Sequence, residues 1–163
     1  MWQRTISVRN AARELEQLQA IASDSSLEKF KIWGINSTHS LLQIASEVLT
    51  GELAAKQRDY ENAIAHLETA VNLEGKLNYD EPETWHYPVR QSLGAILLEA
   101  NRPAEAEQVY REDLKRHPEN GWSLFGLAQS LQTQGKTEEA QAVKKRFEQA
   151  WKDADVTLIA SRF

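Results

Sequence analysis

The sequence contains no cysteine, which excludes disulfides, thiol catalysis and zinc sites built on cysteine. This absence fits a cytoplasmic protein, and we expect that location. No stretch approaches the roughly 18 consecutive apolar residues of a transmembrane helix, and the mean hydropathy is −0.58. The N-terminus lacks a basic and then apolar segment followed by a small-residue cleavage site, so we expect no secretory signal.

Positive charge is also scarce. The 163 residues include 19 Lys and Arg against 24 Asp and Glu, for a net charge of −5. No basic stripe is present to provide the electrostatic attraction on which nucleic-acid and anionic-membrane binding depend. We therefore expect neither a nucleic acid nor a membrane among the partners.

Glycine and proline are few, at seven and four residues, and they stand at junctions between helix-forming stretches. No segment alternates between apolar and polar residues for long, so the pattern predicts an all-α fold. The length fits a single domain spanning 1–163. Ser25, three residues before Glu28, predicts a capping box at the start of the second helix. The predicted helices are 5–22, 26–33, 39–57, 60–74, 87–100, 103–116, 121–133 and 137–152.

An internal repeat organises most of the chain. A set of small and apolar residues recurs with an offset of 34 residues, and an earlier copy precedes it by 34 plus nine. The nine extra residues form an insert at 78–86, NYDEPETWH. The matched residues are Leu93, Gly94, Leu97, Ala106 and Tyr110 with Leu127, Ala128, Leu131, Ala140 and Lys144, and in the earlier copy Gly51, Ala54, Ala63, Leu67 and Ala70.

This 34-residue helix-turn-helix pattern resembles the tetratricopeptide repeat (TPR) family. The resemblance implies a right-handed superhelix of antiparallel helix hairpins, with repeats at 44–77, 87–120 and 121–154. Small residues such as Gly94 and Ala128 would let paired helices approach closely, and Tyr110 would fill the space toward the next hairpin. Lys144, Glu47 and Thr50 stand where large apolar or aromatic residues are usual.

The two ends depart from the repeat. The helix at 5–22 has the spacing of a second helix with no first helix before it, so it is predicted to be a half-repeat, followed by a connecting segment at 23–43. From Asn78 onward the sequence resembles the C-terminal end of larger bacterial TPR proteins. The segments that carry this resemblance are YDEPETWHYPVRQSLGAILLEA, AEAEQVYREDLKRHPENGWSLFGLAQSL and DADVTLIASRF. That resemblance implies architecture and no particular activity.

The residue types that often serve in catalysis or metal binding do not stand at the sequence spacings that such sites need. The four histidines never stand three or four residues apart, so a metal site would need distant segments. Lys144, Lys145 and Arg146 form the only basic triplet, and they point in different directions on a helix. No phosphate-binding or nucleophile motif is present. We therefore expect no metal, no cofactor and no catalytic residue, and we predict that the protein is not an enzyme.

The architecture favours binding. First helices of stacked hairpins line a concave surface that suits an extended peptide or a partner helix. By helical phase, the partner-binding groove is predicted to be lined by Glu52, Lys56, Gln91, Ala95, Leu98, Trp122, Phe125, Gln129 and Gln132. The basic set with which some TPR domains hold a terminal carboxylate is missing. The predicted function is a protein–protein interaction module or scaffold with a protein or peptide partner.

The insert at 78–86 is expected at the rim of this groove. Trp85 is predicted to anchor it near Val89 or Leu93, with Tyr79 beside the ring, and the acidic residues are predicted to form a lip that attracts basic partners. An alternative is a ligand- or metal-binding, possibly catalytic, site around 78–87. The rim residues are Asp80, Glu81, Glu83, Trp85 and His86. The alternative site would use Asp80, Glu81, Trp85, His86 and Tyr87.

Each end of the chain carries a further prediction. In the tail at 155–163, Val156, Leu158 and Ile159 are expected to fold back on the helix at 137–152 and its preceding hairpin. At the other end, Val8, Leu15 and Leu18 are expected to leave an apolar stripe open. Exposed stripes of this kind drive association, so a homodimer through the helix at 5–22 is predicted.

Overall fold

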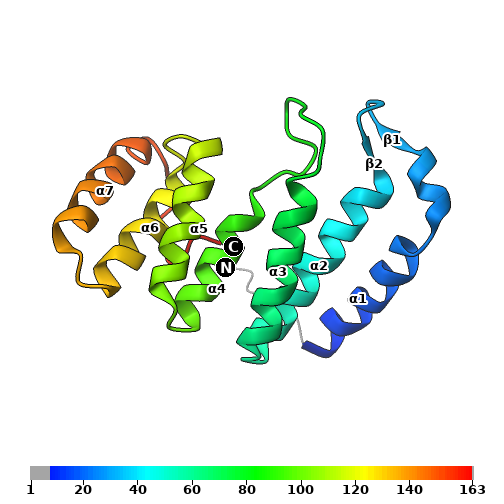
Figure 1. Ribbon diagram of the computed structural model, residues 1–163, viewed down its shortest axis with the longest axis horizontal. Helices are drawn as coiled ribbons and strands as arrows, with labels where there is room; N and C mark the ends of the chain where they lie inside the picture. Colours follow the sequence, from blue (N-terminus) through cyan, green and yellow to red (C-terminus); the bar gives the residue numbers. More distant parts are fainter. Residues whose placement is uncertain (1–7, 163) are drawn as a thin grey trace. The chain divides into compact units, whose positions relative to one another are not determined.

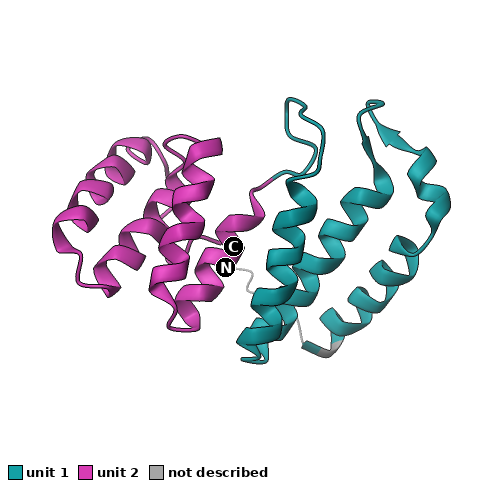
Figure 2. Cartoon of the chain, viewed as in Figure 1, with its two compact units in different colours: residues 1–86 teal, residues 87–163 magenta. Residues whose placement is uncertain are grey.

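The computed structural model describes residues 8–162 and divides the chain into two compact units, 1–86 and 87–163 (Figure 2). Among the described residues, unit 1 holds three α-helices, a short 3₁₀ helix and a two-stranded hairpin, and unit 2 holds four α-helices (Figure 1). The all-α, TPR-like prediction is confirmed. The elements are α1 Val8–Ala22, η1 Ser25–Lys29, β1 Lys31–Ile32, β2 Asn36–Ser37, α2 Thr38–Lys56 and α3 Tyr60–Glu74, followed by α4 Val89–Glu99, α5 Pro103–Arg116, α6 Gly121–Thr133 and α7 Thr137–Ala150.

Three antiparallel helix pairs share one turn geometry. The turns that join α2 to α3, α4 to α5 and α6 to α7 each contain one residue with positive φ, namely Arg58, Asn101 and Gly135. The last two are 34 residues apart and the first two are 43 apart, which is the spacing of the sequence repeat. Helices α3 and α6 each start on a side-chain cap, because Asp59 accepts from the backbone of Asn62 and Asn120 accepts from the backbone of Trp122 and Ser123.

The core of unit 2 is built around Tyr110 on α5. Its side chain is fully buried, and its ring lies where side chains on Gly94 of α4 and Gly126 of α6 would otherwise stand. A Cβ on either glycine would approach the ring to within 2.4 and 2.1 Å respectively. The predicted close approach at Gly94 is therefore present. Gly126 of α6 gives the same close contact with α5 of the preceding pair, and the predicted approach of α7 at Ala128, which is half-buried, stays a prediction.

In unit 1, Leu67 of α3 packs over Gly51 of α2, as the repeat predicts. Helix α1 lies along α2, and this packing buries Leu15 to 8% exposure. The prediction that Leu15 belongs to an open stripe is therefore wrong, although Val8 remains 43% exposed and Ile21 56% exposed. Residues 5–7 of the predicted helix lie outside the described residues. The homodimer stays a prediction.

The predicted helix at 26–33 is wrong. Only Ser25–Lys29 is helical, in 3₁₀ form, and β1 and β2 then pair antiparallel, with Ile32 opposite Asn36. Trp33 and Gly34 both have positive φ at the hairpin turn, a geometry that ends any helix there. The cap is also different from the predicted one, since Asp24 rather than Ser25 accepts the bond from the backbone of Ser26.

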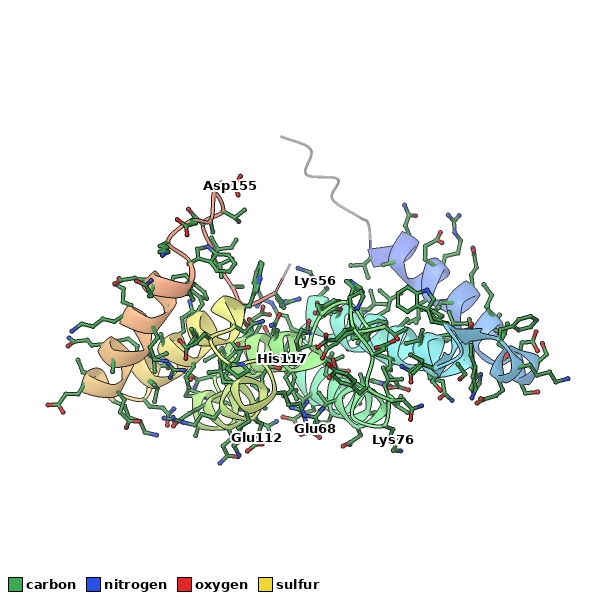
Figure 3. All side chains as sticks on the ribbon, turned by 90° about the horizontal axis from the view of Figure 1, so that it is seen from above. Lys56, Glu68, Lys76, Glu112, His117 and Asp155 are labelled. Carbon is green, nitrogen blue, oxygen red and sulfur yellow. The ribbon has the colours of Figure 1, made fainter. Side chains whose placement is uncertain are left out.

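The C-terminal tail runs back over unit 2. Leu158 is buried as expected, whereas Val156 and Ile159 are 54% and 91% exposed, so the prediction for those two is wrong. The backbone turns after α7, where Trp151 donates from Nε1 to the carbonyl of Val156 at 2.7 Å. Figure 3 shows Asp155 of this turn on the opposite side of unit 2 from Glu112 of α5, and in unit 1 it shows Lys56 opposite Glu68.

Candidate functional site

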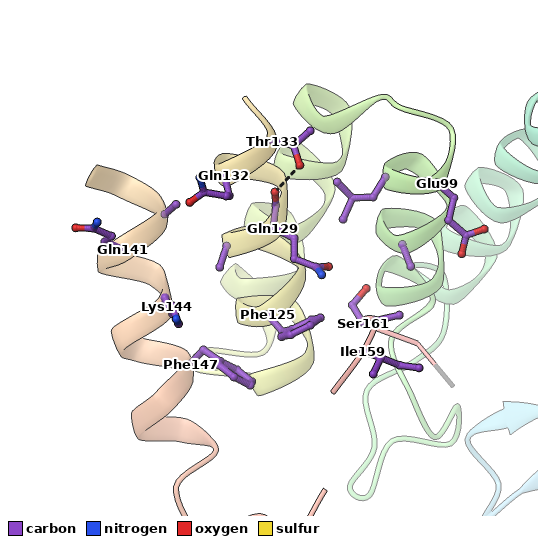
Figure 4. Close-up of a pocket in the computed structure, with 15 residues that line it drawn as sticks. Glu99, Phe125, Gln129, Gln132, Thr133, Gln141, Lys144, Phe147, Ile159 and Ser161 are labelled. Carbon is purple, nitrogen blue, oxygen red and sulfur yellow. Dashed lines mark hydrogen bonds between the residues drawn. The ribbon is translucent and has the colours of Figure 1, made fainter. Parts of the chain in front are cut away.

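A groove of about 700 Å³ opens on unit 2 between α4, α6, α7 and the tail. Its size lies within the range of sites that hold small molecules or short peptide segments. Figure 4 shows α6 between the other two helices, with the tail crossing below. The lining consists of Ala95, Leu98, Glu99, Phe125, Ala128, Gln129, Gln132, Thr133, Ala140, Gln141, Lys144, Phe147, Ile159, Ala160 and Ser161.

An aromatic row forms one wall of this groove and continues beyond it. The rings of Phe125 and Phe147 lie 5.5 Å apart, Phe147 stacks on Trp151 at 5.9 Å, and Trp151 meets Trp122 edge-on at 5.7 Å. Such tilted and stacked pairs are favourable ring geometries. All four side chains are only half-buried, so the row presents apolar surface that a bound segment would cover.

Polar groups stand beside the aromatic row. Gln129 and Gln132 on α6 and Gln141 on α7 have exposed side chains, and amide groups of this kind both donate to and accept from a peptide backbone. The charged lining residues are Glu99 and Lys144. Arg162 donates to Glu99 at 2.8 Å, which leaves Lys144 as the more available charge.

The tail that forms the lower wall is anchored by Ser161. Its hydroxyl lies 2.5 Å from the hydroxyl of Tyr110 and donates to the carbonyl of Gln91 at 3.0 Å. Ser161 is 1% exposed, and burial raises the pKa of Tyr110, so its hydroxyl stays protonated. These bonds fix the position of Ile159, which stands two residues before Ser161. Ile159 lies in the groove wall.

The structure distributes the predicted groove residues over four settings. Ala95, Leu98, Phe125, Gln129 and Gln132 meet in this groove. Gln91 does not line it, because its side chain is 5% exposed and donates to Asn120 at 3.1 Å, so that assignment is corrected. Trp122 belongs to the aromatic row outside the lining. Glu52 and Lys56 lie on α2 of unit 1, and their part in a common groove stays a prediction.

Sequence reasoning missed the wall that α7 and the tail provide. Lys144 and Phe147 stand three residues apart on α7, and Trp151 follows four residues later, so all three share one helix face. The spacing of these three residues can be read from the sequence. The position of Ile159 was not readable, because it depends on the bonds of Ser161 to Tyr110 and Gln91, which are 51 and 70 residues away.

The insert at 78–86 is an ordered loop of unit 1 that is held to β2. Asn36 on β2 donates to the carbonyl of Asn78 at 3.0 Å and to Thr84 at 3.2 Å, and accepts from the backbone of Asn78 at 2.8 Å. The carboxylate of Asp80 accepts from both the backbone and the hydroxyl of Thr84. Figure 1 shows the loop and the hairpin at the same end of this unit.

These bonds correct one rim assignment and the predicted position of Tyr79. Asp80 is 7% exposed and closes the loop, so it does not belong to an acidic lip. Tyr79 is 81% exposed and bonds to Glu81, so it does not pack as an anchor. Glu81, Glu83 and His86 are exposed and Trp85 is half-buried beside the His86 ring. Packing of Trp85 near Val89 or Leu93 stays a prediction.

The alternative site around 78–87 receives no metal-binding geometry from these loop contacts. Within residues 8–162, no group of three or more His, Asp and Glu side chains is placed to hold a metal ion. The Asp80 carboxylate already has two donors from Thr84.

Over the same described residues, no helix combines the length and apolar character needed to cross a membrane.

Comparison with family models finds a match to part of the chain. Residues 97–146 match the family model described as tetratricopeptide repeat. This segment is similar to the tetratricopeptide repeat family. The TPR prediction is thereby confirmed, and the matched residues begin in α4 and end in α7, so they include the α5–α6 pair around Tyr110. The family and the fold support a protein-interaction scaffold in general terms and point to no particular partner.

A solved structure has the same fold. The protein described as "Crystal structure of MamA protein" superposes with a TM-score of 0.60 at 12% sequence identity, and the match covers 91% of this chain and 70% of that one. At this identity the likeness shows the fold alone. A search of curated proteins finds no match. That the chain is the C-terminal part of a longer bacterial protein stays a prediction.

Proposed function

We propose that unit 2 binds an extended polypeptide segment in the groove between α4, α6, α7 and the tail. The observation that carries the proposal is the half-exposed aromatic row beside exposed glutamines. Phe125 and Phe147 offer apolar surface, and Gln129 and Gln132 offer backbone hydrogen bonds on the adjacent face of α6. Aromatic surface combined with a few polar groups is typical of peptide-binding grooves.

The groove is preformed, which lowers the entropic cost of binding. The tail wall is fixed through the Ser161 bonds, and Arg162 fixes Glu99 at its edge. A site whose walls are already ordered loses less conformational freedom when a ligand arrives. Ile159, at 91% exposure, would then bury most of its side chain on binding, and an aliphatic side chain contributes about 1.5–3 kcal/mol when fully buried.

The proposal is tested with the full chain on an array of short synthetic peptides of varied apolar and polar sequence. Phe147→Ala removes a ring from the groove wall, and Phe30→Ala is the matched control, because Phe30 is 62% exposed in unit 1. We expect binding to weaken by about tenfold or more in Phe147→Ala and to stay unchanged in Phe30→Ala. Equal effects of the two changes, or no bound peptide, would contradict the proposal.

A further inference from the structure

We propose that the groove selects a segment in which an apolar side chain is followed or preceded, two residues away, by an aspartate or glutamate. This inference rests on the proposed function and names the class of its ligand. It comes from the placement of one apolar position and one available cation on the same face of α7. The two residues that define these positions are Phe147 and Lys144.

The apolar position lies between three side chains. Figure 4 shows the Phe147 and Phe125 rings next to each other, with Ile159 of the tail across from them. The rings are half-buried and Ile159 is almost fully exposed. A ligand side chain placed here would exclude water from both rings and from Ile159 at once, so an apolar residue is favoured.

The charge of the groove comes from Lys144. Of the fifteen lining residues, Glu99 and Lys144 are charged, and Glu99 is already bound to Arg162. The Lys144 ammonium lies 3.9 Å from Glu148, and the two side chains are 69% and 59% exposed. A pair this long and this exposed is weak, so a carboxylate of the ligand competes for Lys144 readily.

The spacing between the two positions sets the ligand pattern. Lys144 stands three residues before Phe147, which corresponds to about 4.5 Å along the axis of α7. An extended peptide advances about 3.3 Å per residue, and side chains two residues apart point to the same side. An apolar residue in contact with Phe147 therefore brings an acidic residue two positions away within reach of the Lys144 side chain.

The test uses synthetic peptides that share one apolar residue and differ only at the position two residues from it, which is Asp, Asn or Lys. Binding to the full chain is measured by fluorescence anisotropy at low and high salt. We expect the Asp peptide to bind about two- to fivefold tighter than the Asn peptide at low salt. We expect Lys144→Glu to reverse the order of the Asp and Lys peptides. Lys145→Glu is the matched control, since Lys145 is exposed on α7 and does not line the groove.

The outcomes separate this inference from the proposed function. Peptides that bind and are lost in Phe147→Ala, with equal affinity for Asp, Asn and Lys, would overturn the acidic preference and leave the groove proposal standing. An Asp preference that survives Lys144→Glu, or that Lys145→Glu abolishes equally, would also overturn it. If no apolar peptide binds at all, the proposed function fails, and this inference fails with it.

Discussion

The hydroxyl of Tyr110 lies 2.5 Å from the hydroxyl of Ser161, a residue of the irregular tail 51 positions further along the chain. The contact joins the buried centre of unit 2 to the outer wall of its groove. The Tyr110 ring fills the space over Gly94 and Gly126, and the Ser161 hydroxyl also donates a hydrogen bond to the carbonyl of Gln91. Stability and groove shape therefore depend on the same pair.

This pair predicts a measurable coupling. Tyr110→Phe and Ser161→Ala should each lower the free energy of unfolding by about 1–2 kcal/mol, because each leaves a buried hydroxyl with one partner fewer. The double variant should lose less than the sum of the two, as a double-mutant cycle by urea unfolding would show. Tyr79→Phe is the control, since that exposed tyrosine should change stability by less than about 0.5 kcal/mol. Additive losses would mean that the two hydroxyls do not stabilise each other.

Removal of the tail is expected to destabilise unit 2. Truncation after Asp153 exposes the surface that Leu158 covers and removes the bond of Ser161 to Tyr110 and the ion pair of Arg162 with Glu99. Burial of Leu158 alone accounts for about 1.5–3 kcal/mol, so the melting temperature should fall by several degrees. Val156→Ser is the control, because Val156 is exposed. An unchanged melting curve after truncation would show that the tail adds nothing to the core.

The loop at 78–86 yields a prediction that differs from the one made from sequence. In the solvent-exposed acidic lip predicted from the sequence, Asp80→Ala with Glu81→Ala would leave stability nearly unchanged. Because the Asp80 carboxylate closes the loop onto Thr84, we now expect Asp80→Ala to cost about 1–3 kcal/mol by thermal unfolding. Glu83→Ala, at an exposed position of the same loop, should cost less than about 0.5 kcal/mol. Similarly small effects of Asp80→Ala and Glu83→Ala would contradict a stabilising role of the Asp80 carboxylate in this loop.

Glu107 gives unit 2 a dependence on acid pH. Burial alone would raise the pKa of Glu107, but hydrogen bonds from Lys136, Gln134 and Arg111 outweigh it and lower the pKa from 4.5 to about 2. A lowered pKa means that the carboxylate stabilises the fold above pH 4.5 and that this stabilisation is lost as the pH falls from 4.5 to about 2. The Lys136 and Arg111 side chains are 41% and 43% exposed, so solvent screening reduces the effect to about 1–2 kcal/mol.

The measurement is the free energy of unfolding in urea from pH 6 to pH 2. In Glu107→Gln the decline below pH 4.5 should be shallower than in the unchanged chain. Glu138→Gln is the control, since Glu138 is exposed in the first turn of α7. Parallel curves for Glu107→Gln and the unchanged chain would contradict the assigned role of this carboxylate.

Much of the fold was readable because the repeat places small residues where helices meet. Ala63 and Ala106 are fully buried and Ala140 nearly so, as the 34-residue frame requires. The hairpin at 31–37 was not predicted because each of its strands is only two residues long, too short for an alternating pattern, although Gly34 and Asn36 are poor helix formers. Gln91 was misplaced since helical phase alone does not reveal that Asn120 bonds to its side chain.

The most direct test of the groove assignment is to map a bound peptide on the full chain by amide chemical-shift changes in NMR, with the tightest binder from the peptide array as the probe. The account predicts that the changes gather on Phe125, Gln129, Phe147 and Ile159, and that they disappear in Phe147→Ala while persisting in Phe30→Ala. Changes that gather on the hairpin at 31–37 or on the loop at 78–86, with α6 and α7 unaffected, would contradict it.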